Sequence, residues 1–250
     1  APGITLRLVQ PNAAQQAKWD PDLAAQFFNR LLAFSAVKPA PDLVIWPEGA
    51  IPDAINNYLA PGTWTRTAIE GALKPGQVLL VGAYRVEGTQ ADYRVFNSLV
   101  AVRRTTAGLE PAGVYDKFRL VPFGEFIPPG FRWFVEMMNI PLGDFNRGPQ
   151  HPPAFAVGRE RVAPNICYED LFGEALALRF ADEASAPTVL ANVGNIGWFG
   201  DTIAVPQHLL VTRLRTLELQ RPMLRATNTG ATAVIDHRGR SKSTRLNSSH

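Results

Sequence analysis

Short runs of apolar residues alternate along the chain with longer segments in which apolar residues recur every three or four positions. The runs predict buried strands, and the recurring spacing predicts helices with one apolar face. The predicted strands are Thr5–Val9, Asp42–Trp46, Val78–Tyr84, Asn97–Arg103, one that ends at Asn165–Cys167, Val189–Val193, Leu224–Asn228 and Ala231–Asp236. The predicted helices are one that begins at Asp20-Pro21, Thr65–Leu73, Asp170–Asp182 and His208–Arg221. Strands that alternate with helices in this way predict an α/β protein whose helices cover its sheets.

This pattern runs on without a domain-scale linker, so we expect one domain over residues 1–240. The end of the chain, residues 241–250, is rich in Ser, Thr and Asn and holds one long apolar side chain, Leu246. We expect this tail to be disordered or non-native and to lie outside the fold.

Composition narrows the classes of function only slightly. The chain has 250 residues, of which 46% are hydrophobic and 19% charged, as is typical of a globular protein with a sizeable core. Lys242 and Arg245 of the tail supply two charges of the formal net charge of +3. No Lys/Arg cluster with interleaved aromatic residues occurs, so we expect no nucleic-acid partner. No apolar run in the sequence is long enough to cross a bilayer.

The residues that most often bind metals or form disulfides are few. Cys167 is the single cysteine, so no intrachain disulfide can form, and a lone thiol is most often a small buried apolar group. The four histidines show no ligand spacing, so no metal or other cofactor is expected: they are His151, His208, His237 and His250. His208 opens a predicted helix, and we expect it to be structural rather than catalytic.

Three segments place a reactive side chain directly after a predicted strand. They are Leu43-Val-Ile-Trp-Pro-Glu48, Val114-Tyr-Asp-Lys117-Phe-Arg-Leu-Val-Pro-Phe-Gly-Glu125 and Ala163-Pro-Asn-Ile-Cys167-Tyr-Glu169-Asp170. Because ligand sites in α/β sheets lie beyond the carboxyl ends of strands, these segments can meet in one pocket. Each also has a simpler interpretation, with Glu48 as a helix cap, Lys117 as a solvated surface charge and Cys167 as a core residue.

Taken together, in the order Glu, Lys, Cys, these residues resemble the catalytic triad of the nitrilase (carbon–nitrogen hydrolase) superfamily. The surrounding residues resemble one branch of it, the bacterial apolipoprotein N-acyltransferases. Further segments that carry this resemblance are Val9-Gln-Pro-Asn12, Trp46-Pro-Glu-Gly-Ala-Ile-Pro52, Gly197-Trp-Phe-Gly-Asp201, Gln207-His208 and Arg225-Ala-Thr-Asn-Thr-Gly-Ala-Thr-Ala233. The resemblance extends from about Leu6 to Gly239 and implies an α-β-β-α sandwich. Because the family sequence continues past Gly239, we expect the domain to be truncated at its C-terminal end.

The resemblance also implies a role for each member of the triad. Cys167 would be the nucleophile that forms a thioester, because a thiolate is strongly nucleophilic once formed. Glu48 would be the general base for the thiol and later for the incoming amine. Lys117 would stay cationic and stabilise the oxyanion, with the backbone N–H of Tyr168 as a second donor.

Two further carboxylates are expected to support the triad. Glu125 would position Lys117 or assist the second half-reaction. Glu169 follows the nucleophile closely and would either support the site or cap the helix that begins near Asp170.

The most apolar stretch of the chain, Phe123–Leu142, is interrupted by Pro and Gly residues, as is typical of loops and short helices. We expect it to form a lid in which Phe123 and Phe126 contact an acyl chain or the bilayer. Burial in the core is the alternative. Trp198 and Phe199 are a second candidate aromatic contact, with ordinary packing as the alternative.

The function expected from the resemblance is acyl transfer in two half-reactions. A phospholipid acyl donor would acylate Cys167, and the amine of a diacylglyceryl-modified apolipoprotein acceptor would then take the acyl group. The family location is the bacterial inner membrane, with this domain on the periplasmic face and the membrane-spanning segments absent from this chain. The alternatives are a soluble amidase of the same superfamily and a catalytically silent lipid- or lipoprotein-binding module.

Overall fold

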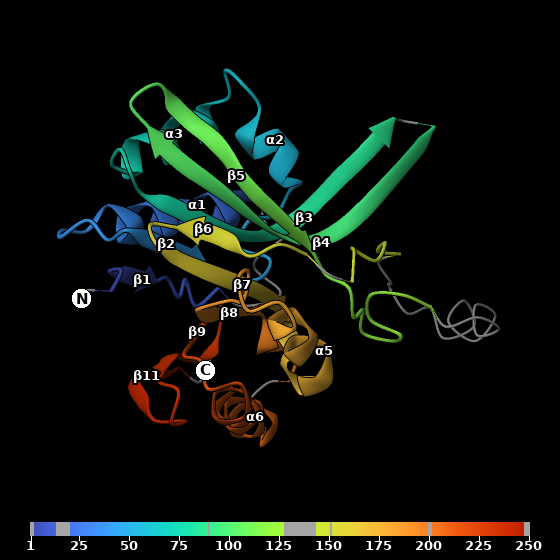
Figure 1. The fold of residues 1–250 in the computed structure, drawn as a ribbon. Coiled ribbons are helices and arrows are strands. Elements are labelled where there is room, and N and C mark those ends of the chain that lie inside the picture. The colour runs from blue at the N-terminus through green and yellow to red at the C-terminus, as the bar shows by residue number, and fades with distance from the viewer. Residues whose placement is uncertain are drawn as a thin grey trace.

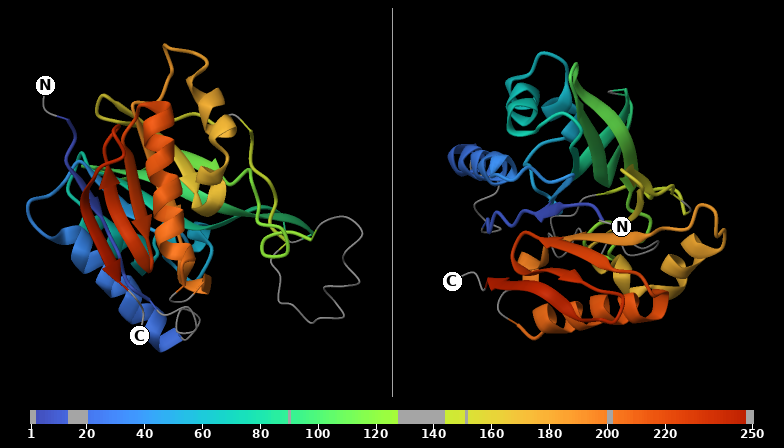
Figure 2. Two further views of the ribbon diagram at one scale, coloured as in Figure 1. Left: turned by 90° about the horizontal axis from the view of Figure 1, so that it is seen from below. Right: turned by 60° about the vertical axis from the view of Figure 1, so that its left-hand side comes forward.

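The computed structural model describes residues 3–13, 21–89, 91–127, 144–150, 152–199 and 202–247. Two sheets pack face to face, and helices cover the outer face of each (Figure 1). Figure 2 shows the four layers from two further directions. The α-β-β-α sandwich expected from the sequence is confirmed.

The first sheet has five strands in the order β1-β2-β3-β4-β5. The strands are β1 (Leu6–Leu8), β2 (Leu43–Trp46), β3 (Val78–Thr89), β4 (Asp92–Thr105) and β5 (Gly108–Asp116). β1, β2 and β3 are parallel, whereas β3, β4 and β5 form an antiparallel meander. The β3–β4 hairpin extends well beyond the body of the sheet (Figure 1). Only the end of β5, before Lys117, was expected from the sequence. Its full extent was not predicted, because Pro111 and two glycines interrupt its apolar pattern.

The second sheet has six strands in the order β11-β10-β9-β8-β7-β6. The strands are β6 (Phe155–Val157), β7 (Glu160–Ile166), β8 (Val189–Gly194), β9 (Met223–Thr227), β10 (Gly230–Ile235) and β11 (Ser241–Asn247). The three central strands are parallel, and the outer ones are antiparallel. The prediction of a disordered tail is therefore wrong for Ser241–Asn247. Its backbone pairs with β10, and strand pairing through the main chain needs no apolar side chains.

The helices on the first sheet are α1 (Pro21–Ala36), α2 (Ile55–Leu59) and α3 (Trp64–Ala72), and those on the second are α5 (Gly173–Ala177) and α6 (Ala204–Leu219). The single helix predicted for Asp170–Asp182 is wrong. The segment forms three short pieces, η2 (Cys167–Leu171), α5 and η3 (Leu178–Phe180). Phe172 leaves the helical region, and Gly173 packs so tightly on Arg215 of α6 that a Cβ there would clash. Within the described ranges, no helix has the length and hydrophobicity needed to cross a bilayer.

Alternating side chains of β2 divide the core into two layers. Leu43 and Ile45 belong to the cluster between the sheets, whereas Val44 and Trp46 belong to the cluster beneath α1 and α3. Successive strand residues point to opposite faces, so a continuous apolar run is required when both faces are covered. Phe28 of α1 meets Trp46 edge to face, with ring centroids 6.1 Å apart.

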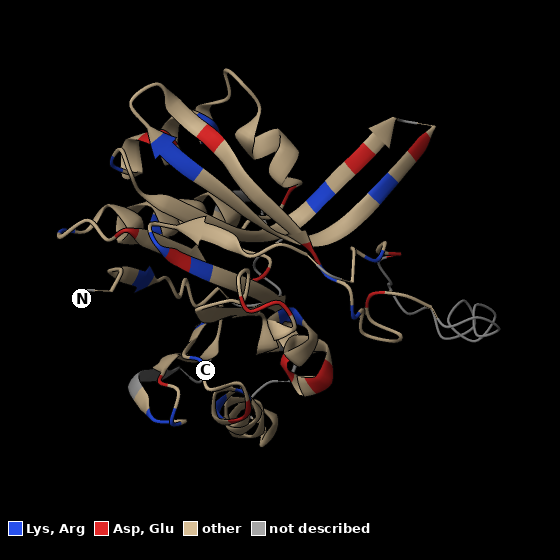
Figure 3. Ribbon diagram, in the orientation of Figure 1, with Lys and Arg blue, Asp and Glu red and all other residues tan. Residues whose placement is uncertain are grey.

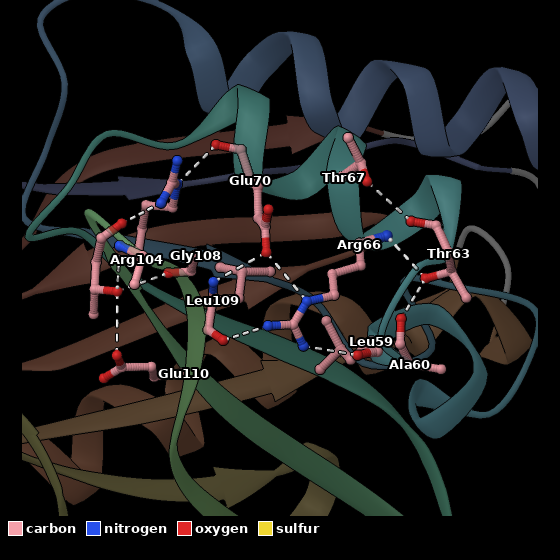
Figure 4. A network of polar contacts seen from close by, with 12 residues as sticks. Leu59, Ala60, Thr63, Arg66, Thr67, Glu70, Arg104, Gly108, Leu109 and Glu110 are labelled. Carbon is pink, nitrogen blue, oxygen red and sulfur yellow. Dashed lines mark hydrogen bonds and ion pairs between the residues drawn. The ribbon is translucent and has the colours of Figure 1, made fainter.

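Polar contacts fasten α3 to the edge strand of the first sheet (Figure 4). Arg66 donates to the carbonyls of Leu59 at 3.0 Å and Leu109 at 2.6 Å. The Glu70 carboxylate accepts from Arg66 and from the backbone N–H of Leu109, both at 3.1 Å. These bonds satisfy the backbone N–H and carbonyl of Leu109 on the outer edge of β5. β5 is the strand that ends immediately before Lys117.

Ion pairs line the projecting hairpin, where positive and negative residues alternate (Figure 3). Glu87 pairs with Arg85 at 2.5 Å and with Arg94 at 2.9 Å. Arg85 also reaches Asp116 at 2.7 Å, and Asp116 accepts from the Ser98 hydroxyl at 2.6 Å. The base of the hairpin is thereby tied to the end of β5.

Candidate active site

Three strands end around one cavity. Glu48 follows the end of β2, Lys117 follows β5 and Cys167 follows β7. All three line a cavity of about 1000 Å³ whose walls are otherwise mainly apolar. The structure therefore brings together the three residues that the sequence analysis singled out, while their chemical roles stay predictions.

Glu48 reaches the cavity because the backbone before it crosses closely over β3. A side chain at Gly82 would clash with the Pro47 carbonyl, so only glycine permits this crossing. The Glu48 carboxylate accepts from the backbone N–H of Asn195 at 2.8 Å through Oε2. It lies 3.7 Å from Lys117 Nζ through Oε1.

Lys117 is a buried cation with two carboxylate neighbours. Its side chain is 1% exposed, and Nζ donates to Glu125 Oε1 at 2.9 Å. Burial by itself would lower the pKa of Lys117, but the charges of Glu48 and Glu125 outweigh it and raise the pKa above its ordinary value. Lys117 therefore stays protonated, as an oxyanion-stabilising group requires.

Asn97 on β4 hydrogen-bonds to both carboxylates of this group, and the sequence analysis missed it. Its Nδ2 donates to Glu48 Oε1 at 2.8 Å and to Glu125 Oε1 at 2.6 Å. Its carbonyl accepts from the backbone N–H of Lys117 at 2.8 Å. The available signal was a polar residue inside an apolar strand pattern. We refer to Glu48, Asn97, Lys117 and Glu125 as the carboxylate–lysine cluster.

Cys167 has an unusual backbone conformation. Its φ is 54°, in the left-handed region that non-glycine residues seldom adopt, and it begins the short helix η2. Burial raises the pKa of the thiol, and the charge of Glu48 raises it further against the opposing effect of Lys117. The thiol is therefore protonated at rest, so a neighbouring base must take its proton when sulfur attacks.

Glu169 joins the loop that carries Lys117 to the turn that carries Cys167. Its Oε1 accepts from the backbone N–H groups of Phe118 at 3.0 Å and Arg119 at 2.9 Å. Its Oε2 accepts from the Tyr115 hydroxyl at 2.6 Å and the Ile166 N–H at 2.8 Å. The carboxylate therefore ties together the two segments that carry Lys117 and Cys167, while the supporting role expected for Glu169 stays a prediction. Burial raises its pKa.

The other predicted residues differ in position. The Tyr168 hydroxyl donates to the Leu120 carbonyl at 2.6 Å, and its ring lies 5.4 Å from Lys117 Nζ. Phe123 lines the cavity, whereas the ring of Phe126 packs beneath Arg147 with the guanidinium carbon 5.0 Å from its centroid. Residues 128–142 of the predicted lid and the side chains of Trp198 and Phe199 lie outside the described residues.

A second polar network supports Cys167 from the other sheet. Arg225 Nη1 lies 3.5 Å from Asp170 Oδ2, and both side chains are completely buried. Arg225 Nη2 bonds to His208 Nδ1 at 2.9 Å, and His208 Nε2 bonds to Asp170 Oδ1 at 2.8 Å. Asn192 accepts from Arg225 at 2.8 Å and donates to the Cys167 carbonyl at 2.9 Å. We refer to Asp170, Asn192, His208 and Arg225 as the arginine–aspartate network.

The geometry of this network assigns the hydrogen atoms of His208. A guanidinium only donates, so Nδ1 accepts and Nε2 carries the hydrogen that Asp170 receives. Both ring nitrogens are thus committed, as expected for a structural histidine. Across the part of the chain that the structure describes, no group of His, Cys, Asp and Glu side chains is arranged to hold a metal ion.

Comparisons with known proteins place this chain in a family. Residues 5–245 match the carbon–nitrogen hydrolase family. The apolipoprotein N-acyltransferase of Verminephrobacter eiseniae is 47% identical over 242 residues, covering 95% of this chain and 43% of that protein. The one from Caulobacter vibrioides is 44% identical over 247 residues, covering 94% of this chain and 45% of that protein. The chain therefore spans less than half the length of these curated relatives.

Solved structures agree on the fold. A Saccharomyces cerevisiae member of branch 10 of the nitrilase superfamily superposes with a TM-score of 0.66, covering 99% of this chain and 87% of that one. Its sequence identity of 15% makes this likeness evidence of the fold alone. With the family match over nearly the whole chain, these findings show that the chain belongs to the carbon–nitrogen hydrolase family.

Proposed function

We propose that this domain moves a fatty acyl group from a phospholipid to the N-terminal amine of a diacylglyceryl-modified apolipoprotein, through a thioester on Cys167. One observation carries the proposal: Glu48, Lys117 and Cys167 line a single, mainly apolar cavity of about 1000 Å³. Small polar nitriles and amides do not need such walls, whereas an acyl chain does. The names of the relatives support the same choice.

In the first half-reaction, Glu48 takes the thiol proton while sulfur attacks the ester carbonyl of the phospholipid. The negative oxygen of the tetrahedral intermediate is stabilised by Lys117 and by the backbone N–H of Tyr168. The intermediate then expels the lysophospholipid alkoxide, which takes the proton back from Glu48. The acyl group remains on Cys167 as a thioester.

The hydrogen bonds of the two carboxylates support Glu48, rather than Glu125, as the base. Glu125 accepts from Asn97 at 2.6 Å, from Lys117 at 2.9 Å and from the Val121 N–H at 2.8 Å. Glu48 accepts from two donors at 2.8 Å, and Lys117 Nζ is farther away, at 3.7 Å. With three donors, Glu125 is fixed beside Lys117 and positions it, and we assign Glu48, which has two donors, as the base.

In the second half-reaction, the acceptor amine attacks the thioester carbonyl and Glu48 takes one amine proton. The cysteine sulfur leaves, recovers that proton and yields the amide product. The thioester must survive until the amine arrives, so water has to be kept from it. Apolar side chains on the described walls of the cavity serve this purpose: Ala24, Phe27, Ile51, Val121 and Val211.

The proposal extends to the location of the whole protein. The reaction joins two lipid substrates, so we place the protein in the bacterial inner membrane with this domain on the periplasmic face. Segments outside this chain would provide the membrane-spanning part.

The test is an assay on the full-length protein in detergent, with a phospholipid that carries a labelled acyl chain and a diacylglyceryl peptide. We expect lysophospholipid and N-acylated peptide in equal amounts, and neither product from Cys167→Ala. Labelled free fatty acid without acylated peptide would favour a hydrolase. Binding of either lipid without turnover would favour a silent binding module.

A further inference from the structure

Asn97 has no role in the proposed reaction, although it lies in the carboxylate–lysine cluster. It is buried on β4, opposite Tyr84 of β3, at the point where the hairpin leaves the body of the sheet. The amide nitrogen Nδ2 carries two hydrogens, and each goes to a different carboxylate, Glu48 at 2.8 Å and Glu125 at 2.6 Å. One side chain therefore bridges both acidic residues of the site.

The charges around this bridge do not cancel. Glu48 and Glu125 carry two negative charges, and among the described residues one cation, Lys117, pairs with both of them. Two carboxylates that share one site repel each other, because like charges at short range destabilise one another. A protonated Glu48 could not accept the proton of Cys167. The cluster thus needs further stabilisation of both anions, and two hydrogen bonds to charged acceptors provide it.

We propose that Asn97 is a positioning residue that keeps Glu48 and Glu125 ionised together, so that Glu48 is ready to take the Cys167 proton. The proposal rests on the proposed function only for the choice of Glu48 as base. Asn97 touches the carboxylates and not the reacting atoms. The backbone carbonyl of Asn97 accepts from the backbone N–H of Lys117 at 2.8 Å. This bond holds Lys117, the cation of the cluster, next to Asn97.

Other ionisable groups near the cluster are bound elsewhere. The Tyr84 hydroxyl donates to Asp53 at 3.1 Å, and the Tyr168 hydroxyl donates to the Leu120 carbonyl at 2.6 Å. Among the described residues, the other ionisable groups that line the cavity or act on Lys117 or Cys167 are Cys167, Glu169, Asp170, His208 and Arg225. Glu169 and Asp170 are satisfied by the contacts already described, which leaves Asn97 as the shared donor of Glu48 and Glu125.

The experiment measures how fast iodoacetamide alkylates Cys167 as pH rises, on the intact protein in detergent, with the Cys167 peptide quantified by mass spectrometry. Alkylation needs the thiol and its base but no acyl substrate, so it separates this proposal from the proposed function. In Asn97→Ala, we expect the acidic limb of the profile to move upward by about one pH unit, because two donors to the anions are lost. In Asn97→Asp, a third carboxylate moves it further, and in Asn97→Ser one remaining donor gives an intermediate shift.

Asn56→Asp is the matched control, because Asn56 lies outside the cavity lining and only its Oδ1 is used, accepting from the Val86 N–H at 2.9 Å. Its profile should match that of the wild type. Superimposable acidic limbs in folded Asn97 variants would overturn the proposal, as would loss of folding in all three, which would mark Asn97 as structural. If the limbs shift as expected but phospholipid acylates nothing, the proposed function fails and the role of Asn97 stands.

Discussion

Two groups of buried charges flank Cys167, and they are built in opposite ways. The carboxylate–lysine cluster on the first sheet faces the cavity and has one more negative charge than positive. The arginine–aspartate network on the second sheet pairs one cation with one anion, and both of these side chains are completely sealed from solvent. The histidine of this network has both ring nitrogens bound within it.

The difference shows that burial of charge does not by itself mark a catalytic group. An unbalanced cluster beside a cavity can bind a proton at low cost, which is what acid–base chemistry requires. A balanced network whose cation and anion are both buried resists such a change and holds geometry instead. Here it holds the Cys167 carbonyl through Asn192, and so contributes to the left-handed backbone at Cys167.

The largest effect on activity is expected from Glu48→Gln in the carboxylate–lysine cluster. The thiol of Cys167 is protonated at rest, so loss of the base should slow acylation by about 10³-fold or more, with little change in melting temperature. In this variant the thiol must ionise unaided, and since its pKa is raised, the residual rate should climb about tenfold per pH unit between about pH 6 and pH 9. A flat residual profile would contradict Glu48 as the base.

The largest effect on stability is expected from Arg225→Met in the arginine–aspartate network. It leaves Asp170 buried without its cation, which should cost about 3–5 kcal/mol in the free energy of unfolding, as measured with denaturant. The double variant Asp170→Leu/Arg225→Met removes both charges and should recover much of that loss. A stable Arg225→Met protein with no acylation would instead give this network a chemical role.

Lys117→Met tests the carboxylate–lysine cluster, and the change in activity expected from it is intermediate in size. It removes one oxyanion donor and should lower acylation about 10²–10³-fold. The rate of Cys167 acylation and the melting temperature are measured on the same sample. Unchanged acylation with a large fall in melting temperature would make Lys117 structural.

The smallest effect on stability and activity is expected at Glu169, which joins the loop that carries Lys117 to the turn that carries Cys167. Tyr115→Phe removes one of four donors to Glu169, which keeps its bonds to three backbone N–H groups. We expect a loss of about 1–2 kcal/mol in stability and less than tenfold in acylation rate. A loss of activity as large as that of Glu48→Gln would show that Glu169, not the strands, sets the geometry of the triad.

The sequence predicted those parts of the molecule that depend on local pattern. The strand-then-reactive-residue arrangement located Glu48, Lys117 and Cys167, and the apolar run at Asp42–Trp46 predicted a buried strand. The partners of Asn97 and Glu169 could not be predicted, because the hydrogen bonds join residues about 30 to 50 positions apart. The break in the predicted Asp170–Asp182 helix likewise depends on a tertiary contact, that of Gly173 with Arg215.

The central claim is that Cys167 forms an acyl thioester and waits for an amine. The most direct measurement gives the full-length protein phospholipid alone, without acceptor, and records the mass of the protein. The account predicts a stable increase equal to one acyl group on the Cys167 peptide, absent in Cys167→Ser and much slower to form in Glu48→Gln. Rapid release of free fatty acid with no adduct, or an adduct on another residue, would contradict it.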